Sequence, residues 1–180
     1  MARTKVQGGD YGRRRRVPEW YSTTHKRVLH ARKEATTRLQ FYFHDTFSGK
    51  NPSAVRVAEA PTSSTSPTLF GAVVMADDRL TAGPEPASRL VGRAQGIYAS
   101  SSQQETALTM AMTFCFSEGK LSGSCLSVLG RNPVAEQVRE ITVVGGCGAF
   151  RMARGYAIAR TYSFNALGDA VVGYNFTVVH

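Results

Sequence analysis

The sequence has few cysteines and no long apolar run. Its three cysteines, Cys115, Cys125 and Cys147, are too few and too scattered for a disulfide framework, and none forms the close pair typical of a structural zinc site. No stretch approaches the roughly 18 consecutive apolar residues of a membrane-spanning helix. Residues 1–40 also lack the apolar core of a signal peptide, so the sequence alone predicts a soluble chain without a targeting segment.

Acidic residues are fewer than basic ones, and nearly all of the excess positive charge lies in the N-terminal part. The whole chain has a net charge of +9. Residues 1–40 contain eleven Lys or Arg against three acids, whereas residues 41–180 contain eleven against ten. We interpret residues 1–38 as a disordered basic tail, and contact with phosphates or an acidic partner is the alternative. A nucleic-acid-binding module would also need a basic folded face, which the nearly neutral remainder does not offer.

From Leu39 onward, apolar residues recur with the period of two that strands require. The clearest run is Glu105–Phe116, where large apolar side chains alternate with small ones. Further strands are expected at residues 39–45, 55–58, 70–76, 121–129, 138–144, 155–164 and 170–179. Because Cys115 and Cys125 lie on segments that can pair as a hairpin, one disulfide is the alternative to the two buried thiols that we expect.

The expected strands and their short connections predict an antiparallel sandwich or barrel. We expect the barrel, because closure removes exposed strand edges, and a barrel of about eight strands can hold one small ligand. The seventeen glycines suit the turns and bends of a closing sheet. The predicted organisation is therefore a tail at residues 1–38 and one all-β domain at residues 39–180.

Several segments combine glycines, charges and aromatics in an order that strand formation does not explain. They are FYFHD from Phe41, LTAGP from Leu80, VGRAQGIY from Val91, LSVLGRNP from Leu126, VREITVVGG from Val138, FRMARGYA from Phe150 and GDAVVGYN from Gly168. In this order they resemble the plant dirigent family from about Leu39 to the C-terminus. The resemblance implies an eight-stranded antiparallel barrel, of the kind also seen in allene oxide cyclases, that forms a trimer or dimer with a pocket in each barrel.

The resemblance also implies a function. Dirigent proteins impart stereoselectivity on the coupling of monolignol radicals, such as those of coniferyl alcohol, in lignan biosynthesis. A separate oxidase or laccase supplies the radicals, and the dirigent protein does not oxidise them. Some members instead catalyse dehydration and ring closure through a quinone methide, which gives pterocarpans. Neither activity requires a metal or an organic cofactor, and the family usually works in the apoplast.

Three residues are the candidate catalytic groups. Asp45 shares a strand face with Phe41 and Phe43, and burial there would raise its pKa so that the protonated form can donate a proton. By resemblance Asp45 matches the pocket aspartate, while an exposed aspartate that caps a turn is the alternative. Arg139 and Tyr98 match a pocket arginine and a pocket tyrosine; Arg139 would bind phenolic oxygen or form an internal salt bridge.

Other residues receive supporting interpretations. Phe43 and Asp78 are expected to contact substrate, with Asp78 at the pocket rim. Asn132 stands where some relatives carry a second aspartate, and because a carboxamide does not transfer protons near neutral pH, a two-acid mechanism does not carry over unchanged. His44 is expected to face away from the pocket, toward the exterior or a subunit contact. Asn175 begins a glycosylation sequon that matters only in a secreted chain.

Overall fold

The computed structural model describes residues 34–180, so the predicted tail lies outside the described residues up to position 33. The strands are β1 Thr36–Asp45, β2 Ala54–Ala58, β3 Val73–Thr81, β4 Leu90–Ser100, β5 Ala107–Phe116, β6 Cys125–Pro133, β7 Arg139–Cys147, β8 Arg154–Phe164 and β9 Ala170–Val179. Three short 3₁₀ turns complete it, η1 Ser63–Thr65, η2 Gly119–Leu121 and η3 Gly148–Phe150. Within residues 34–180, no helix has the length and apolar character needed to cross a membrane.

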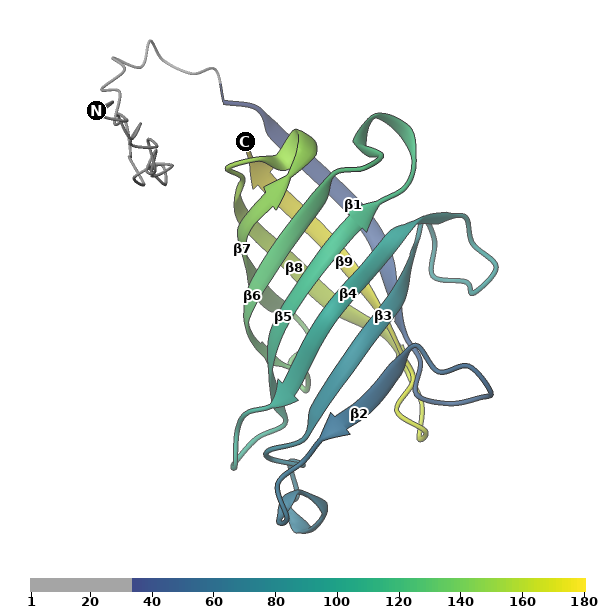
Figure 1. Cartoon of the computed structure of the whole chain (residues 1–180), viewed down its shortest axis with the longest axis vertical. Coiled ribbons are helices and arrows are strands. Elements are labelled where there is room, and N and C mark those ends of the chain that lie inside the picture. Colours follow the sequence, from purple (N-terminus) through teal and green to yellow (C-terminus); the bar gives the residue numbers. More distant parts are fainter. Residues whose placement is uncertain (1–33) are drawn as a thin grey trace, which may run out of the picture. The chain divides into compact units, whose positions relative to one another are not determined.

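The strands form one antiparallel sheet that closes on itself (Figure 1). Neighbours follow the order β1-β9-β8-β7-β6-β5-β4-β3-β2, and an additional pairing of β1 with β3 closes eight of them into a barrel. The expected eight-stranded antiparallel barrel is therefore confirmed. Closure leaves no open edge among the eight strands, which removes the unpaired backbone groups of a flat sheet.

The ninth strand, β2, continues the path of β1 along the same edge of β3. Tyr42 to His44 of β1 pair with the end of β3, and Ala54 to Arg56 of β2 pair with its beginning. Residues 46–53 leave the sheet between the β1–β3 pairing and the β2–β3 pairing. At the end of this segment, the amide of Asp77 donates a hydrogen bond to the carbonyl of Ser53 at 2.8 Å. The excursion places Ser53 beside Asp78, in the interior of the barrel.

Aromatic side chains fill much of the barrel interior. Seven rings form a connected cluster, with centroids such as those of Phe41 and Phe176 separated by 5.3 Å. Its members are Phe41, Phe43, Phe114, Phe116, Phe150, Tyr174 and Phe176, all buried. Tilted and edge-to-face pairs of this kind each add about 1 kcal/mol to the free energy gained from burial. The cluster gives the barrel a packed centre.

Strand β4 was not among the predicted strands, because its glycines hide the alternation. A Cβ at Gly92 would lie 2.1 Å from the carbonyl oxygen of Cys115, and a Cβ at Gly96 would lie 2.2 Å from that of Ala111. Gly96 also has a φ of +153°, a conformation that L side chains rarely adopt. Both glycines are required because the backbone of β5 approaches β4 at these positions.

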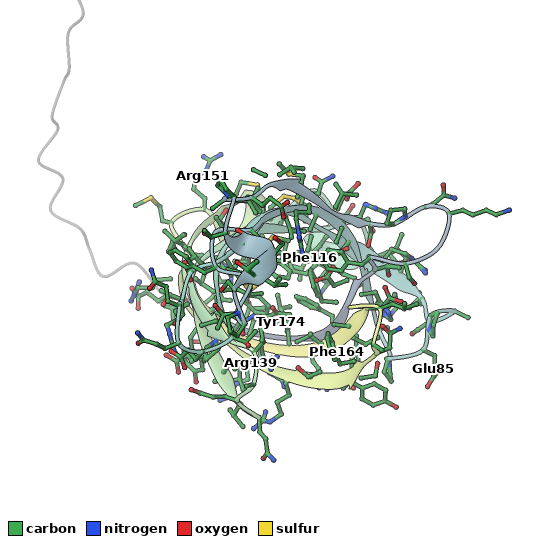
Figure 2. The ribbon with its side chains drawn as sticks, turned by 90° about the horizontal axis from the view of Figure 1, so that it is seen from below. Glu85, Phe116, Arg139, Arg151, Phe164 and Tyr174 are labelled. Atoms are coloured by element: carbon green, nitrogen blue, oxygen red, sulfur yellow. A yellow bond between two sulfur atoms is a disulfide. The ribbon has the colours of Figure 1, made fainter. Side chains whose placement is uncertain are left out.

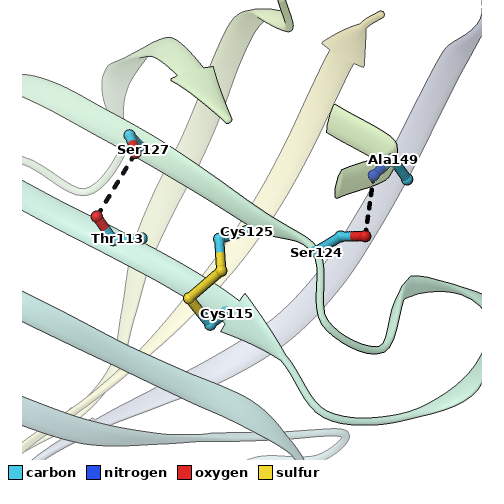
Figure 3. The surroundings of a disulfide bond; sticks show 6 residues. All are labelled: Thr113, Cys115, Ser124, Cys125, Ser127 and Ala149. Carbon is cyan, nitrogen blue, oxygen red and sulfur yellow. Dashed lines mark hydrogen bonds between the residues drawn. A yellow bond between two sulfur atoms is a disulfide. The ribbon is translucent and has the colours of Figure 1, made fainter. Parts of the chain in front are cut away.

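The expectation of two buried thiols in the β5–β6 hairpin is wrong. Cys115 and Cys125 face each other across β5 and β6, with Cα atoms 4.1 Å apart, and form a disulfide (Figure 3). Both residues are partly exposed on the outer face of the sheet. Directly opposed residues of an antiparallel pair are close enough for such a bond, so the hairpin register accounts for the correction.

Candidate functional site

Most of the predicted site residues lie toward the same end of the barrel, which is the lower end in Figure 1. Asp45 ends β1, Asn132 lies one residue before the end of β6, and Arg139 begins β7. Since neighbouring strands run in opposite directions, these strand ends meet at one opening. Figure 2 views the barrel from below and shows Tyr174 within the ring of strands, close to Arg139.

Asp45 and Tyr98 are joined by a hydrogen bond. The hydroxyl of Tyr98 donates to Oδ2 of Asp45 at 2.7 Å, although the two residues come from strands separated by β3. Burial raises the pKa of Asp45 to about 6, while the hydrogen bond from Tyr98 acts in the opposite direction. Burial and the nearby carboxylate raise the pKa of Tyr98, so its phenol stays protonated.

Asp78 supplies a second carboxyl group beside Asp45. Its side chain is fully buried, and the hydroxyl of Ser53 donates a hydrogen bond to its Oδ1. Burial, and next the negative charge of Asp45, raise the pKa of Asp78 to about 8. The site therefore contains two acids even though position 132 is an asparagine. At neutral pH most of the Asp78 carboxyl is protonated and can donate a hydrogen bond.

Arg139 points into the barrel together with Ile141 and Val143, the next inward-facing residues of β7. Its Nη1 donates to the carbonyls of Val134 and Glu136 at 3.2 and 3.1 Å and to the hydroxyl of Thr161 at 2.9 Å. Burial lowers its pKa. Among residues 34–180 Arg139 forms no ion pair, so the internal salt bridge that was its alternative role is absent there.

Asn132 is buried beside Met110, the thioether of which accepts from Nδ2 at 3.1 Å. A thioether sulfur is a weak acceptor, so this contact leaves much of the hydrogen-bonding capacity of the carboxamide unused. Asn132 and Arg139 flank the connection from β6 to β7. The structure does not bring either residue into hydrogen-bond contact with Asp45 or Asp78.

Four buried side-chain atoms have no hydrogen-bond partner within the described part of the chain. They are Oδ1 of Asp45, Oδ2 of Asp78, Oδ1 of Asn132 and Nε of Arg139. An unpaired buried polar group costs about 1–3 kcal/mol, so folded proteins rarely retain several. All four atoms belong to residues that the sequence assigned to the site. Together they offer hydrogen-bonding capacity to a polar ligand.

Two aromatic residues connect the polar end to the packed centre. Phe43, predicted to contact substrate, lies with its ring 6.0 Å from that of Tyr174. Tyr174 was not predicted, although its alternation with Phe176 and Val178 in β9 shows that it faces inward. Burial raises the pKa of Tyr174, and the charge of nearby Arg139 acts in the opposite direction. Ser53 was also missed, because a serine in an irregular segment carries no distinguishing pattern.

A cavity of about 420 Å³ opens beside Asp45. Its walls come from the end of β1, the segment 46–53, Arg79, Pro86 and residues 163–171, and they do not include Tyr98, Asn132 or Arg139. Asp169 ties two of these walls together, because its carboxylate accepts from the amides of Phe47 and Ser48 at 2.8 and 2.9 Å. Hydrogen bonds from Ser48 and Asn165 hold the pKa of Asp169 at about 2.

His44, Asp77 and Asn175 lie outside the barrel interior. His44 is buried on the other side of β1, where its Nε2 lies 2.7 Å from the hydroxyl of Thr81. Since that hydroxyl donates to the carbonyl of Gly83, Nε2 must be the donor. Asp77 is exposed and pairs with Arg93. Asn175 is exposed in β9, so the sequon lies on the surface.

Comparison with known proteins gives a consistent result. The family model described as "Dirigent-like protein" matches residues 36–179. Dirigent protein 23 of Arabidopsis thaliana is 57% identical over 149 residues, which cover 82% of this chain and 80% of the relative. Pterocarpan synthase 1 of Glycine max is 50% identical over 163 residues, which cover 89% and 88%. The solved structure of the pterocarpan synthase dirigent protein GePTS1 superposes with a TM-score of 0.78 at 52% identity and covers 84% of this chain and 88% of that one.

Proposed function

This chain belongs to the dirigent family, and we propose that its barrel binds phenoxy radicals of monolignols such as coniferyl alcohol and directs their coupling to one stereoisomer. A separate oxidase or laccase generates the radicals. The barrel contributes orientation, because two radicals held in one arrangement couple through one pair of faces. No residue of the site is assigned an oxidising role.

The observation that carries the proposal is the group of four unpaired polar atoms at one end of the barrel. Asp45, Asp78, Asn132 and Arg139 each present one such atom, and the aromatic side chains of Phe43 and Tyr174 lie next to this end. A phenylpropanoid has the matching chemistry, namely an aromatic ring with phenolic and alcoholic oxygens. An apolar pocket with a few convergent polar groups is the usual form of a small-molecule site.

The acids and the arginine have distinct roles in this proposal. Coupling of two radicals gives a quinone methide, and ring closure requires that its oxygen gain a proton. The protonated form of Asp45, with a pKa of about 6, donates that proton. The guanidinium of Arg139 stabilises negative charge that develops on a phenolic oxygen, because it keeps a free Nε–H in a buried position.

A second candidate function is dehydration and ring closure of an isoflavonoid alcohol through a quinone methide, without any oxidant. Two observations favour it. The two carboxyls Asp45 and Asp78 have raised pKa values, which suits general acid catalysis. The pterocarpan synthases of Glycine max and Glycyrrhiza echinata are each 50% identical to this chain.

One experiment with two arms separates the candidates. In the first arm, the protein and a laccase are incubated with coniferyl alcohol, and the enantiomeric excess of the coupled product is measured. A racemic product at saturating protein would exclude this substrate assignment. In the second arm, an isoflavanol is incubated with the protein alone, and formation of pterocarpan is followed by chromatography; no turnover would exclude the cyclase function.

Asp45→Asn tests the site in either arm. In both arms we expect it to lower the rate at which the ring-closed product forms by about 100-fold, since general acid catalysis contributes 10²–10⁴-fold. Asp77→Asn is the matched control, because Asp77 is a neighbouring aspartate that is exposed and outside the site. Full activity of Asp45→Asn would refute the proton-transfer role.

We also propose that the protein assembles as a homo-oligomer. A row of apolar side chains crosses the outer face of β2, β3 and β4, where Val55 pairs with Met75 and Met75 pairs with Ile97. Each is at least 40% exposed, which suits burial against another copy. Light scattering coupled to gel filtration tests this assembly, and replacement of Met75 by Lys should yield monomers.

The apoplast is the proposed location. The disulfide between Cys115 and Cys125 supports it, because disulfides persist in oxidising compartments. The exposed sequon at Asn175 is compatible with secretion. Imaging of a C-terminal fluorescent fusion in plasmolysed plant cells tests this location. Fluorescence that stays inside the shrunken protoplast would exclude the apoplast.

A further inference from the structure

The three cysteines of the chain lie in a row across three neighbouring strands. Cys115 in β5 is the registered partner of Cys125 in β6, and Cys125 is the registered partner of Cys147 in β7. The first pair forms the disulfide, whereas Cys147 is a free, exposed thiol. Cys125 therefore has a cysteine on each side, and the disulfide uses only one of them.

A bulge in β7 places Cys147 on the same face as the disulfide. Earlier in β7 the odd-numbered residues Ile141 and Val143 face the interior, so an uninterrupted strand would turn Cys147 inward. The register shifts where Ser127 pairs with Gly145 and Val128 pairs with Val143, which inserts one extra residue into β7. After the shift Gly146 faces the interior beside Phe150, and Cys147 faces outward.

We propose that these three cysteines form a thiol–disulfide exchange site in which Cys147 displaces Cys115 from Cys125. Cys147 loses its proton to solvent, and its thiolate attacks Sγ of Cys125. The bond between Cys115 and Cys125 breaks, its electron pair leaves on Sγ of Cys115, and that thiolate takes up a proton. One disulfide and one thiol are present before and after, so the step needs no oxidant or reductant.

The row sets the direction of attack. Cys147 and Cys115 lie on opposite sides of Cys125, so the entering and leaving sulfurs are opposed as displacement at sulfur requires. Registered antiparallel residues have Cα atoms about 4.5–5.5 Å apart, within the range that a disulfide bridges. Cys115 and Cys147 are two strand spacings apart, about 9.5 Å, which is beyond that range. Cys125 is therefore the sulfur shared by both disulfides.

The exchange moves the cross-link within the barrel. The disulfide to Cys115 closes the short turn that contains η2, with a sequence separation of 10. The disulfide to Cys147 would instead tie the open end of the β6–β7 hairpin, the other end of which carries Asn132 and Arg139. The two states constrain different pairs of strands, and the second one constrains a hairpin that contributes to the candidate site.

Peptide mapping of the full-length protein under non-reducing conditions tests the exchange. Trypsin cuts after Lys120, Arg131 and Arg139, so the three cysteines fall on separate peptides. The protein is incubated at pH 8, trapped with N-ethylmaleimide and digested. We expect a Cys125–Cys147 cross-linked peptide and alkylated Cys115, both of which increase with incubation time. Neither product should form when Cys147 is alkylated before incubation. A wild-type map that keeps only the Cys115–Cys125 link at all times would overturn the proposal.

Two serine variants provide a matched pair. In Cys115→Ser, mild oxidation by oxidised glutathione should form the Cys125–Cys147 disulfide within the monomer. In Cys125→Ser, the same treatment should leave Cys115 and Cys147 without an intramolecular link, since they lie too far apart. Thermal unfolding checks that both variants are folded. Failure of folded Cys115→Ser to form the second disulfide would also overturn the proposal.

Discussion

The hydroxyl of Tyr98 donates a 2.7 Å hydrogen bond to Oδ2 of Asp45, and it does so across the strand that lies between them in the sheet. The bond joins an acid of raised pKa to a phenol that stays protonated. Oδ1 of the same carboxyl has no hydrogen-bond partner within residues 34–180. Tyr98 therefore fixes one oxygen of Asp45 and leaves the other oriented for a ligand.

Replacement of Tyr98 by Phe should raise the pKa of Asp45 above about 6, because the lost hydrogen bond is a contribution that lowers it. Carbon-detected NMR titration of the Asp45 carboxyl measures the shift. Tyr162→Phe removes an exposed hydroxyl from the outer face and is the control. An unchanged Asp45 titration in Tyr98→Phe would contradict the assigned effect of the hydrogen bond.

Asp78→Asn should become progressively more stable than the wild type as pH rises. The pKa of Asp78 is about 8 in the folded state and 3.8 for an unperturbed aspartate, so its stabilising contribution is complete below about pH 3.8 and is lost progressively as pH rises to about 8. Between pH 5 and 9 the difference in unfolding free energy should change by about 4 kcal/mol in favour of the variant. Urea unfolding at several pH values measures it.

Asp77→Asn is the control for that experiment, since the pKa of Asp77 is lowered by Arg93 and titration ends below this window. His44 titrates in both proteins and cancels in the comparison. A difference between Asp78→Asn and the wild type that stays constant with pH would show that the carboxyl is ionised in the folded state.

Arg139→Met should lower the free energy of unfolding by about 2–4 kcal/mol, because it leaves the carbonyls of Val134 and Glu136 and the Thr161 hydroxyl without their donor. Thr161→Val should cost about 1 kcal/mol, since it removes one of these contacts. Arg151→Met, at an exposed position, should change stability by less than about 0.5 kcal/mol. Equal effects of the two arginine variants in chemical denaturation would contradict this role.

Gly96→Ala should prevent stable folding or cost at least about 3 kcal/mol, since the added Cβ would lie 2.2 Å from the carbonyl oxygen of Ala111 and the φ of Gly96 is +153°. Gly145→Ala should change stability by about 0.5 kcal/mol or less, because a Cβ there meets nothing within 4 Å. Soluble yield and thermal unfolding compare the two. A well-folded Gly96→Ala with wild-type stability would show that β4 and β5 can separate at this point.

Asp169→Ala should increase amide hydrogen exchange at Phe47 and Ser48, because it removes the acceptor of both amides. The increase in exchange should be confined to this segment, residues 46–53, because the segment forms only part of the cavity wall beside Asp45. Amide exchange of Gln95, in the middle of β4, provides the internal control. Unaltered exchange at Phe47 and Ser48 would show that Asp169 does not hold this segment.

The barrel was predictable where side chains alternate in size and polarity. Leu108, Met110 and Met112 made β5 evident, whereas Gly92 and Gly96 removed the same signal from β4. The strand predicted to start at Leu121 begins at Cys125, because residues 119–121 form a 3₁₀ turn and Gly123 adopts a φ of +79°. Alternation reports which side a residue faces, but it does not report where a turn ends.

The site was predictable in part for a similar reason. Alternation and family resemblance together led to the prediction that Asp45, Tyr98, Asp78 and Arg139 belong to the site. Neither signal indicated that Ser53 would meet Asp78, because that contact depends on the path of an eight-residue excursion between β1 and β2. The absence of a salt bridge for Arg139 was also not predictable, since it depends on backbone carbonyls that become available only in the folded barrel.

The pairing of β1 with β9 has a consequence for synthesis on the ribosome. Ten registered pairs, from Thr36 with Val179 to Asp45 with Ala170, join the first strand to the last. During translation β1 has no partner on this edge until almost the whole chain has emerged. Such long-range pairing is slow and leaves a strand edge exposed to aggregation in the meantime. Truncation within β9 would therefore leave a chain that cannot close, even though Asp45, Asp78, Tyr98 and Arg139 are already present.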